Sequence, residues 1–217
     1  MSPQAALKDL ESDSPGVRVR AADALSKTTG EVADQARPAL RAHLNDDDAE
    51  VRYTVALALG ELKDPLAVQA LIEVTEGDGN PLPRQAAVIA LGMIGDKRAT
   101  RPLARMLRDA PPDVRFQATT SLVQVNPEKA SGYLRKALKD PDPEVRASAA
   151  AALGDLDQHK SVNALAALLS DPTGPVQLEA AVSLARLGDR RGSEILILAL
   201  ERSGTRHLAA EMLFRCP

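Results

Sequence analysis

The chain of 217 residues contains few of the residues that build large cores or covalent frameworks. Aromatic residues make up only 2% of it, tryptophan is absent, and Cys216 is its one cysteine. One cysteine cannot form an intramolecular disulfide, which is consistent with a reducing compartment. Because aromatics are so few, Leu, Val, Ile and Ala must fill the core, and these residues favour closely packed helices over a sheet.

Signals for a membrane, for secretion or for a nucleic-acid partner are also missing. The N-terminal segment has no basic start followed by an apolar stretch, and no apolar run reaches the about 18 residues that a membrane span needs. The chain has 27 Lys and Arg against 30 Asp and Glu, a net charge of −3, so it is not a globally basic nucleic-acid binder. We expect a soluble, cytoplasmic protein.

An internal repeat is the strongest feature that the sequence does contain. A ten-residue pattern, V-R-x-x-A-A-x-A-L-G, recurs with starts 29 to 34 residues apart. The copies begin at Val17, Val51, Pro83, Val114, Val145, Val176 and Thr205, the last being degenerate. Because no long insertion separates them, we predict a single repeat domain over residues 1–217.

Each copy is predicted to be a hairpin of two helices. Apolar residues spaced by three and four before the pattern, as in Leu66–Val74, mark a first amphipathic helix, and the pattern itself marks the second. Short breakers rich in Asp and Pro separate the two helices, and the Gly of A-L-G is expected to stop the second one. The predicted hairpins span approximately residues 3–27, 34–62, 66–94, 97–125, 128–156, 159–187 and 191–214. Because one hairpin cannot bury its apolar stripe alone, the hairpins are expected to stack.

The V-R-x-x-A-A-x-A-L-G helix resembles the HEAT repeats, particularly the short bacterial and archaeal type that also occurs in bilin lyases. Pro38 and Pro102 inside first helices add to the likeness, as does an Asp six residues before the Arg. The resemblance covers the chain from Pro3 to Phe214. It implies an all-α fold, a right-handed α-α superhelix or α-solenoid of about seven hairpins.

In this family, such Asp and Arg residues form a ladder that runs between neighbouring repeats. The resemblance assigns this structural role to Asp46, Arg52, Asp78, Arg84, Asp109, Arg115, Asp140 and Arg146. The pattern departs from the family after Asp171, where Gln177 replaces the Arg. It also departs near both ends, where Ser12 and Leu200 occupy the Asp position.

The third and seventh positions of each second helix are predicted to point away from its core face. HEAT-like solenoids place second helices on the inner, concave surface, so these positions form a predicted apolar stripe there. Its members are Val19, Tyr53, Leu57, Ile89, Phe116, Leu178 and Val182. Exposed apolar patches usually mark interaction sites, but tight curvature would instead pack these side chains on neighbouring repeats.

Positive charge is concentrated between Asp96 and Lys139, where ten Lys and Arg face four Asp and Glu, a local net charge of +6. The predicted basic patch consists of Arg98, Arg101, Arg105, Arg108 and Lys136. It would suit an acidic protein surface or a phosphate backbone, or it is simply a solvated convex face.

Signals for catalysis are weak. His43, His159 and His207 occupy different repeat positions, and no His-Glu pair of the di-iron deoxyhypusine hydroxylase kind is present. The sequence has no His/Cys metal spacing, phosphate loop or nucleophile elbow, and Cys216 has no companion base. We therefore predict a protein that is not an enzyme and has no cofactor or metal.

The sequence leaves several kinds of function and partner possible. The first hypothesis is a non-catalytic scaffold or adaptor that binds a protein segment, such as an amphipathic helix, on the concave stripe. An alternative, which the resemblance suggests, is an accessory subunit of an enzyme system of lyase or cofactor-loading type. A weaker one is phosphate-backbone binding by the convex basic patch, although nucleic acid is not the expected partner. Because no repeat follows Leu208, Met212, Leu213 and Phe214, self-association through the C-terminal hairpin is also expected.

Overall fold

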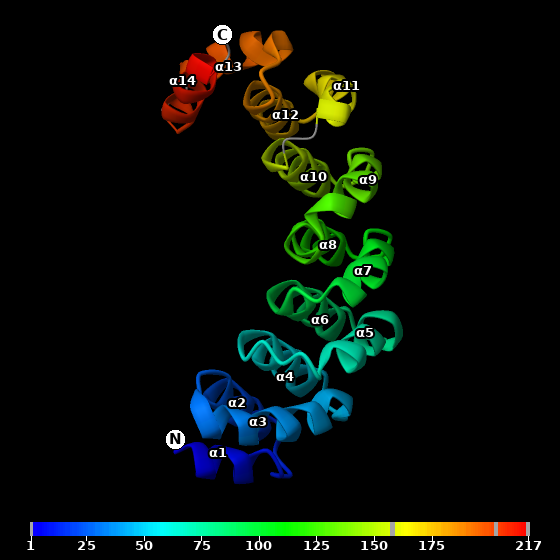
Figure 1. The fold of residues 1–217 in the computed structure, drawn as a ribbon, viewed down its shortest axis with the longest axis vertical. Helices are drawn as coiled ribbons and strands as arrows, with labels where there is room; N and C mark the ends of the chain where they lie inside the picture. Colours follow the sequence, from blue (N-terminus) through cyan, green and yellow to red (C-terminus); the bar gives the residue numbers. More distant parts are fainter. Residues whose placement is uncertain (1, 157–158, 202–203, 216–217) are drawn as a thin grey trace. The chain divides into compact units, whose positions relative to one another are not determined.

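The computed structural model describes residues 2–156, 159–201 and 204–215. Within these ranges the chain consists of helices joined by short turns and contains no strand, so the predicted all-α class is confirmed (Figure 1). None of the described helices has the length and apolar character that crossing a membrane requires. Contacts group the chain into two compact units, Met1–Asn126 and Pro127–Pro217.

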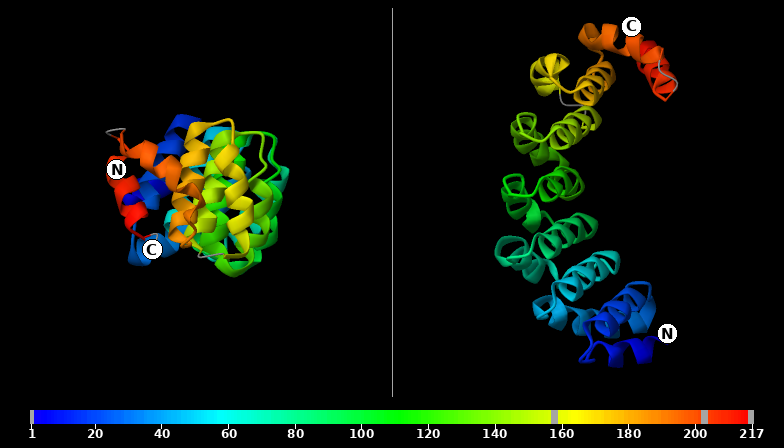
Figure 2. Two further views of the ribbon diagram at one scale, coloured as in Figure 1. Left: turned by 90° about the horizontal axis from the view of Figure 1, so that it is seen from above. Right: turned by 180° about the vertical axis from the view of Figure 1, so that it is seen from behind.

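Unit 1 contains four hairpins, each with a first and a second helix (Figure 1). The pairs are α1 (Pro3–Asp9) with α2 (Pro15–Ser26), α3 (Gly30–Ala42) with α4 (Ala49–Glu61), α5 (Val68–Gly77) with α6 (Pro81–Ile94), and α7 (Thr100–Met106) with α8 (Pro112–Val125). The 3-10 turns η1 (His43–Asn45) and η2 (Lys97–Ala99) lie between helices. Second helices pack on one another in the order α2, α4, α6, α8, as Figure 2 also shows from behind.

Unit 2 contains three hairpins of the same kind. They pair α9 (Pro127–Ala137) with α10 (Pro143–Asp155), α11 (Val162–Ala167) with α12 (Gly174–Arg186), and α13 (Ser193–Leu200) with α14 (Arg206–Arg215). The 3-10 turns are η3 (His159–Ser161), η4 (Leu168–Ser170) and η5 (Arg190–Gly192). Helix α10 packs on α12, and α14 packs on both α12 and α13. The described helices of both units therefore confirm the predicted stack of hairpins.

Asp and Asn side chains cap the second helices α4, α6 and α10, as the turn composition indicates. The Asp48 carboxylate accepts hydrogen bonds from the backbone N–H groups of Glu50 and Val51 at 2.9 and 3.1 Å. Asp142 caps α10 in the same way, and the side chain of Asn80 caps α6. These contacts satisfy backbone donors that have no partner inside the helix.

The glycine of A-L-G has a different role from the helix stop that the sequence predicts. Gly60, Gly92 and Gly154 are buried inside second helices. A Cβ atom on Gly154 would lie 2.9 Å from the Cα atom of Ser183 in α12, too close for any real contact. The glycine therefore allows two successive second helices to touch through their backbones.

The helices end instead at the residues that follow. Gly95 after α6 and Gly188 after α12 have φ angles of 76° and 73°, in the left-handed region that glycine adopts readily. Lys63 occupies the same place after α4 with a φ of 47°. The sequence pattern therefore identifies a helix contact, whereas the stop lies just beyond it.

An arginine near the start of each of several second helices connects two repeats. Arg52 donates through Nε and Nη2 to the carboxylate of Asp78 in the next repeat, at 2.6 and 3.0 Å. Its Nη1 donates to the backbone oxygen of Asp46 in its own turn, at 2.8 Å. Arg84 repeats this arrangement with the carboxylate of Asp109 and the backbone oxygen of Asp78. Each such arginine therefore closes its own turn and holds the following one.

Other arginines at equivalent positions make one or both of these contacts. Arg146 pairs with the carboxylate of Asp171 and donates to the backbone oxygen of Asp140. Arg115 donates to the backbone oxygens of Asp109 and Ala110. Arg18, which the sequence analysis did not include, pairs with Asp46 at 2.6 and 2.8 Å. The ion pairs thus join an arginine to the Asp of the next repeat, while the Asp of its own repeat contributes its carbonyl.

This register explains where the motif departs from the pattern. Gln177 still donates to the backbone oxygen of Asp171, and Arg206 to that of Leu200, because a carbonyl contact needs no carboxylate. An arginine at position 177 would have its acidic partner at position 200. Gln177 and Leu200 therefore occupy the two positions at which this ladder ion pair would otherwise form.

Burial and hydrogen bonding compete in setting the charge of the ladder carboxylates. Burial disfavours ionised Asp78, but hydrogen bonds from Arg52 and from the backbone N–H of Asn80 outweigh it, so the pKa of Asp78 lies below its ordinary value of 3.8. Arg146 lowers the pKa of Asp171 against the opposing effect of burial. A carboxyl pKa below that of the unfolded chain stabilises the fold above the unfolded pKa. This stability is lost as pH falls through the folded-state pKa.

The substitution Gly154→Ala is expected to lower the free energy of unfolding by about 1–3 kcal/mol, because its Cβ would force α10 and α12 apart. Gly132→Ala is the matched control. A Cβ at Gly132, inside α9, would meet no atom within 4 Å. Alanine is the better helix former, so this change is expected to add up to about 1 kcal/mol. Urea unfolding measures both, and shifts of the same sign would contradict the close-approach role.

The substitution Arg52→Leu is expected to lower the free energy of unfolding at pH 7 by about 3 kcal/mol, because it leaves the half-buried Asp78 charge without its partner. Burial then raises the Asp78 pKa, so protonation relieves part of the loss. The difference between parent and variant should therefore shrink as pH falls from about 5 towards 3.

Urea unfolding across this pH range, with the exposed Arg20→Leu as control, tests the ladder. A difference that stays constant with pH would show that Arg52 acts only through packing.

Candidate interaction site

The second helices of unit 1 carry five of the predicted stripe residues. Val19 lies on α2, Tyr53 and Leu57 on α4, Ile89 on α6 and Phe116 on α8, and all five are half-buried. They therefore belong neither to the core nor to the fully exposed surface. Each keeps part of its side chain in contact with a neighbouring helix and offers the rest to solvent.

A hollow of about 300 Å³ lies between α2 and α4 and brings three stripe residues together. It is lined by Val19, Asp23, Ser26, Tyr53, Thr54, Leu57, Ala58 and Glu61. We call it the α2–α4 groove. Ile89 and Phe116 lie on later second helices and are not part of its lining.

The groove has an apolar wall and acidic ends. Val19, Tyr53 and Leu57 supply apolar surface from two helices, whereas Asp23 and Glu61 supply carboxylates. The Lys27 ammonium group donates to both carboxylate oxygens of Asp23 at 2.8 and 3.0 Å. Such a surface can hold an apolar side chain between flanking charges.

Several residues that line the groove do not belong to the stripe predicted from the sequence. That prediction treated the third and seventh helix positions as the exposed face and omitted Ser26 at the tenth and Glu61 at the eleventh. Residues spaced by three, four and seven share one helix face, so extending the same face by one turn identifies both. Only the pairing of α2 with α4 needs the structure.

Unit 2 does not extend the stripe. Val182 is 1% exposed and packs in a core cluster with Ala181, Ala185, Leu196 and Met212, so its predicted exposure is wrong. Leu178 is half-buried and packs against the same cluster. The physical reason is that α14 packs on α12 and covers the face that unit 1 leaves open.

The predicted basic patch is divided between the two units. Arg98, Arg101, Arg105 and Arg108 are exposed on η2, α7 and the turn after α7 in unit 1, and Lys136 is exposed on α9 in unit 2. Arg98 pairs with Asp96 at 2.8 Å, and Arg105 pairs with Glu76. Half of the arginines of this patch in unit 1 are thus neutralised by neighbours.

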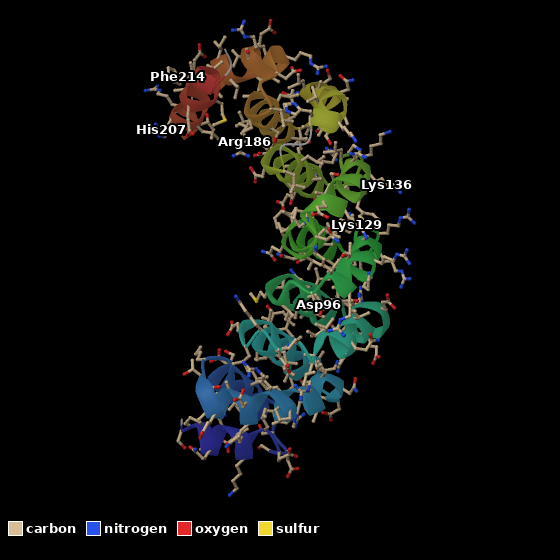
Figure 3. All side chains as sticks on the ribbon, viewed as in Figure 1. Asp96, Lys129, Lys136, Arg186, His207 and Phe214 are labelled. Atoms are coloured by element: carbon tan, nitrogen blue, oxygen red, sulfur yellow. The ribbon has the colours of Figure 1, made fainter. Side chains whose placement is uncertain are left out.

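The candidate catalytic residues do not gather in one place. His43 in η1 has its Nδ1 atom 3.0 Å from the backbone oxygen of Ala39, and His159 is exposed on η3. His207 is exposed on α14 (Figure 3). In the part of the chain that the structure describes, no three His, Cys, Asp or Glu side chains are placed to hold a metal ion. Cys216 lies outside the described residues.

The last hairpin exposes a second apolar surface, separate from the groove. Ile197 and Leu198 on α13 are 54% and 62% exposed, and Leu208 and Phe214 on α14 are 37% and 92% exposed. Figure 3 labels Phe214. We call these four residues the C-terminal apolar surface. Met212, by contrast, is buried in the core cluster.

The sequence matches the family model described as HEAT repeats over residues 3–91, 37–123, 70–139, 100–185 and 131–213. The bilin biosynthesis protein PecE of Mastigocladus laminosus is 44% identical over 62 residues, which are 29% of this chain and 23% of that protein. PecE of Nostoc sp. strain PCC 7120 is 45% identical over 60 residues, 28% of this chain and 24% of the relative. The matched region thus spans about a quarter of these relatives.

Solved structures share the fold. The complex of CpcE and CpcF of phycocyanin lyase from Nostoc sp. PCC7120 contains a chain with a TM-score of 0.64 and 22% identity, covering 100% of this chain and 94% of that one. A designed armadillo repeat protein has a TM-score of 0.52 and 21% identity, covering 85% of this chain and 99% of the designed one. Both show that the hairpins stack as a helical solenoid.

We expect the C-terminal apolar surface to pair with the same surface of a second copy, because in unit 2 the preceding hairpin is covered by a hairpin of the same kind. The double substitution Leu198→Lys/Phe214→Lys should then shift a dimer to a monomer in light scattering. Leu66→Lys, at a 73% exposed leucine of unit 1, is the control and should leave the mass unchanged. A parent protein that is monomeric at every concentration would contradict this expectation.

Proposed function

The chain belongs to the HEAT-repeat family, and on that premise we propose that it is a non-catalytic interaction subunit that holds a partner protein segment in the α2–α4 groove. The main support is the groove itself, which unites three stripe residues from two successive repeats. A stack of hairpins held at a fixed spacing presents such a surface without any further element. Catalysis, in this proposal, belongs to the partner.

An amphipathic helix is the segment that this groove fits best. Its apolar side chains would lie against Val19, Tyr53 and Leu57, in a hollow of about 300 Å³. Basic residues beside those side chains would face Glu61. Because Tyr53 is a large ring with a polar tip, it is the expected anchor of the contact.

Site-directed photo-crosslinking tests the groove in extracts of the source organism. A photoreactive phenylalanine analogue replaces Thr54 in the groove or, as control, the exposed Gln69 on α5. We expect a distinct adduct from position 54 alone. Adding Tyr53→Ala and Leu57→Ala should weaken that adduct by about tenfold or more, since truncating an interface anchor typically removes over 1 kcal/mol.

A folded variant is required for this comparison, and circular dichroism checks it. Phe116→Ala, which changes the stripe outside the groove, should keep the adduct. Identical adducts from positions 54 and 69 would overturn the groove proposal.

A more specific role is supported by the 44% identity with PecE over 62 residues. On this basis the partner would be a second subunit of a bilin-handling lyase, and this chain would be the accessory subunit. The groove would then serve assembly of the pair, and no bilin-contacting residue of this chain is implied.

Reconstitution separates this role from a general scaffold. The chain replaces CpcE in an assay of the phycocyanin lyase of Nostoc, whose solved complex contains CpcE and CpcF. We expect bilin addition to phycocyanin to exceed the rate with CpcF alone and to fall again with Tyr53→Ala/Leu57→Ala. A rate equal to that of CpcF alone would remove the bilin role, while the cross-linking result would still decide the groove.

A further inference from the structure

A pocket lined by cations lies on the first helix of unit 2 and has no part in the proposed function. Its volume is about 520 Å³, and its lining consists of Glu128, Lys129, Ser131, Gly132, Tyr133, Arg135, Lys136 and Lys160. All of these except Lys160 belong to α9, and Lys160 comes from η3. We call it the α9 pocket. Figure 3 shows Lys129 and Lys136 on the side of unit 2 away from Arg186.

The periodicity of α9 places the lining residues around a glycine, Gly132, which has no side chain. Positions 128 and 129, 132, and 135 and 136 follow one another at spacings of three and four, so they share one face of α9. Gly132 sits at the centre, and a Cβ atom there would meet no atom within 4 Å. The backbone of α9 therefore forms the floor, with open space above it. Lys160 adds a wall from outside the helix.

Three of the cations around this space have no ion-pair partner among the described residues. Arg135, Lys136 and Lys160 form no ion pair with any described residue. Elsewhere in unit 2, Arg186 pairs with Asp155 at 2.7 Å and Arg191 pairs with Asp189 at 2.8 Å. Among the described residues of the lining, Glu128 is the one carboxylate. Cations that converge on one hollow without partners favour an anion there.

The shape of the charge distribution selects the kind of anion. A nucleic-acid strand carries regularly spaced phosphates and needs a long line of cations, whereas Arg135, Lys136 and Lys160 line one hollow. Arginine binds phosphate through two parallel hydrogen bonds, and lysine adds a compact charge. A volume of about 500 Å³ lies in the range of small-ligand pockets. Tyr133 adds an aromatic ring on which a flat base can stack.

We propose that the α9 pocket binds a compact organic diphosphate of the nucleoside diphosphate class. The phosphoryl groups lie between Arg135, Lys136 and Lys160, and the base lies against Tyr133. This site goes beyond the proposed function and does not depend on it, because its residues belong to a first helix of unit 2 and the groove belongs to unit 1.

Titration calorimetry of the full chain with ADP, inorganic pyrophosphate and adenosine tests the site. We expect ADP to bind more tightly than pyrophosphate, and adenosine to give no measurable heat. Lys136→Gln/Lys160→Gln should weaken ADP binding by about tenfold or more, because each lost charge-assisted hydrogen bond is worth over 1 kcal/mol. Lys139→Gln, an exposed lysine outside the lining, is the matched charge control and should have little effect.

Filling the pocket provides a second, charge-independent test. Gly132→Phe should abolish ADP binding, whereas Gly132→Ala should keep it, and both variants are expected to fold because the space above Gly132 is open. Circular dichroism and thermal unfolding verify the fold. The proposal is overturned if neither phosphate probe binds, or if Lys139→Gln weakens binding as much as the pocket variants. It is also overturned if a single-stranded oligonucleotide binds more tightly than ADP and is unaffected by Gly132→Phe.

Discussion

The arginine that joins two successive turns is the interaction on which the arrangement of hairpins depends. Arg52 closes its own turn through the carbonyl of Asp46 and holds the next turn through the carboxylate of Asp78. At the other end of the same helix, Gly60 lets α6 approach to backbone contact. Helix α4 is thus fixed to the next repeat by charge at its start and by close packing at its end. Side chains between these two contacts have little freedom to change their spacing.

This constraint fixes the geometry of the α2–α4 groove. Since α2 and α4 are held by the pair Arg18 and Asp46, the apolar side chains of Val19, Tyr53 and Leu57 lie at a set distance across a narrow hollow. A partner segment would meet a preformed surface, which reduces the ordering entropy that binding must overcome. The groove is therefore a consequence of how repeats join, and it needs no loop or cofactor.

The sequence allowed the hairpins, their bounds and most ladder residues to be predicted, because helical periodicity and turn chemistry are local. It did not show that Gly154 allows Ser183 of the next second helix to come close. In the sequence, a glycine near a helix end looks the same whether it ends that helix or makes room for a neighbouring helix. Periodicity identified the face that carries Val182, but only the path of α14 determines that this face is covered. The α9 pocket could not be predicted from the sequence for a related reason. Its floor is the absent side chain of Gly132, and one wall comes from Lys160 in the next hairpin.

Whether a charged side chain has an ion-pair partner distinguishes structural surfaces from surfaces that are available for binding. In unit 1, Arg105 of the first helix α7 is neutralised by Glu76, and the open surface is the apolar face of α2 and α4. In unit 2, α14 covers the corresponding face of α12, and Arg135 and Lys136 of α9 line a hollow without an ion pair to any described residue. The repeats are similar in sequence and backbone, so the fold alone does not decide which helix presents a site. Neighbours decide it: in unit 1 they leave part of the apolar face of α2 and α4 open, whereas in unit 2 they cover the face of α12 and leave Arg135 and Lys136 without an ion pair to any described residue.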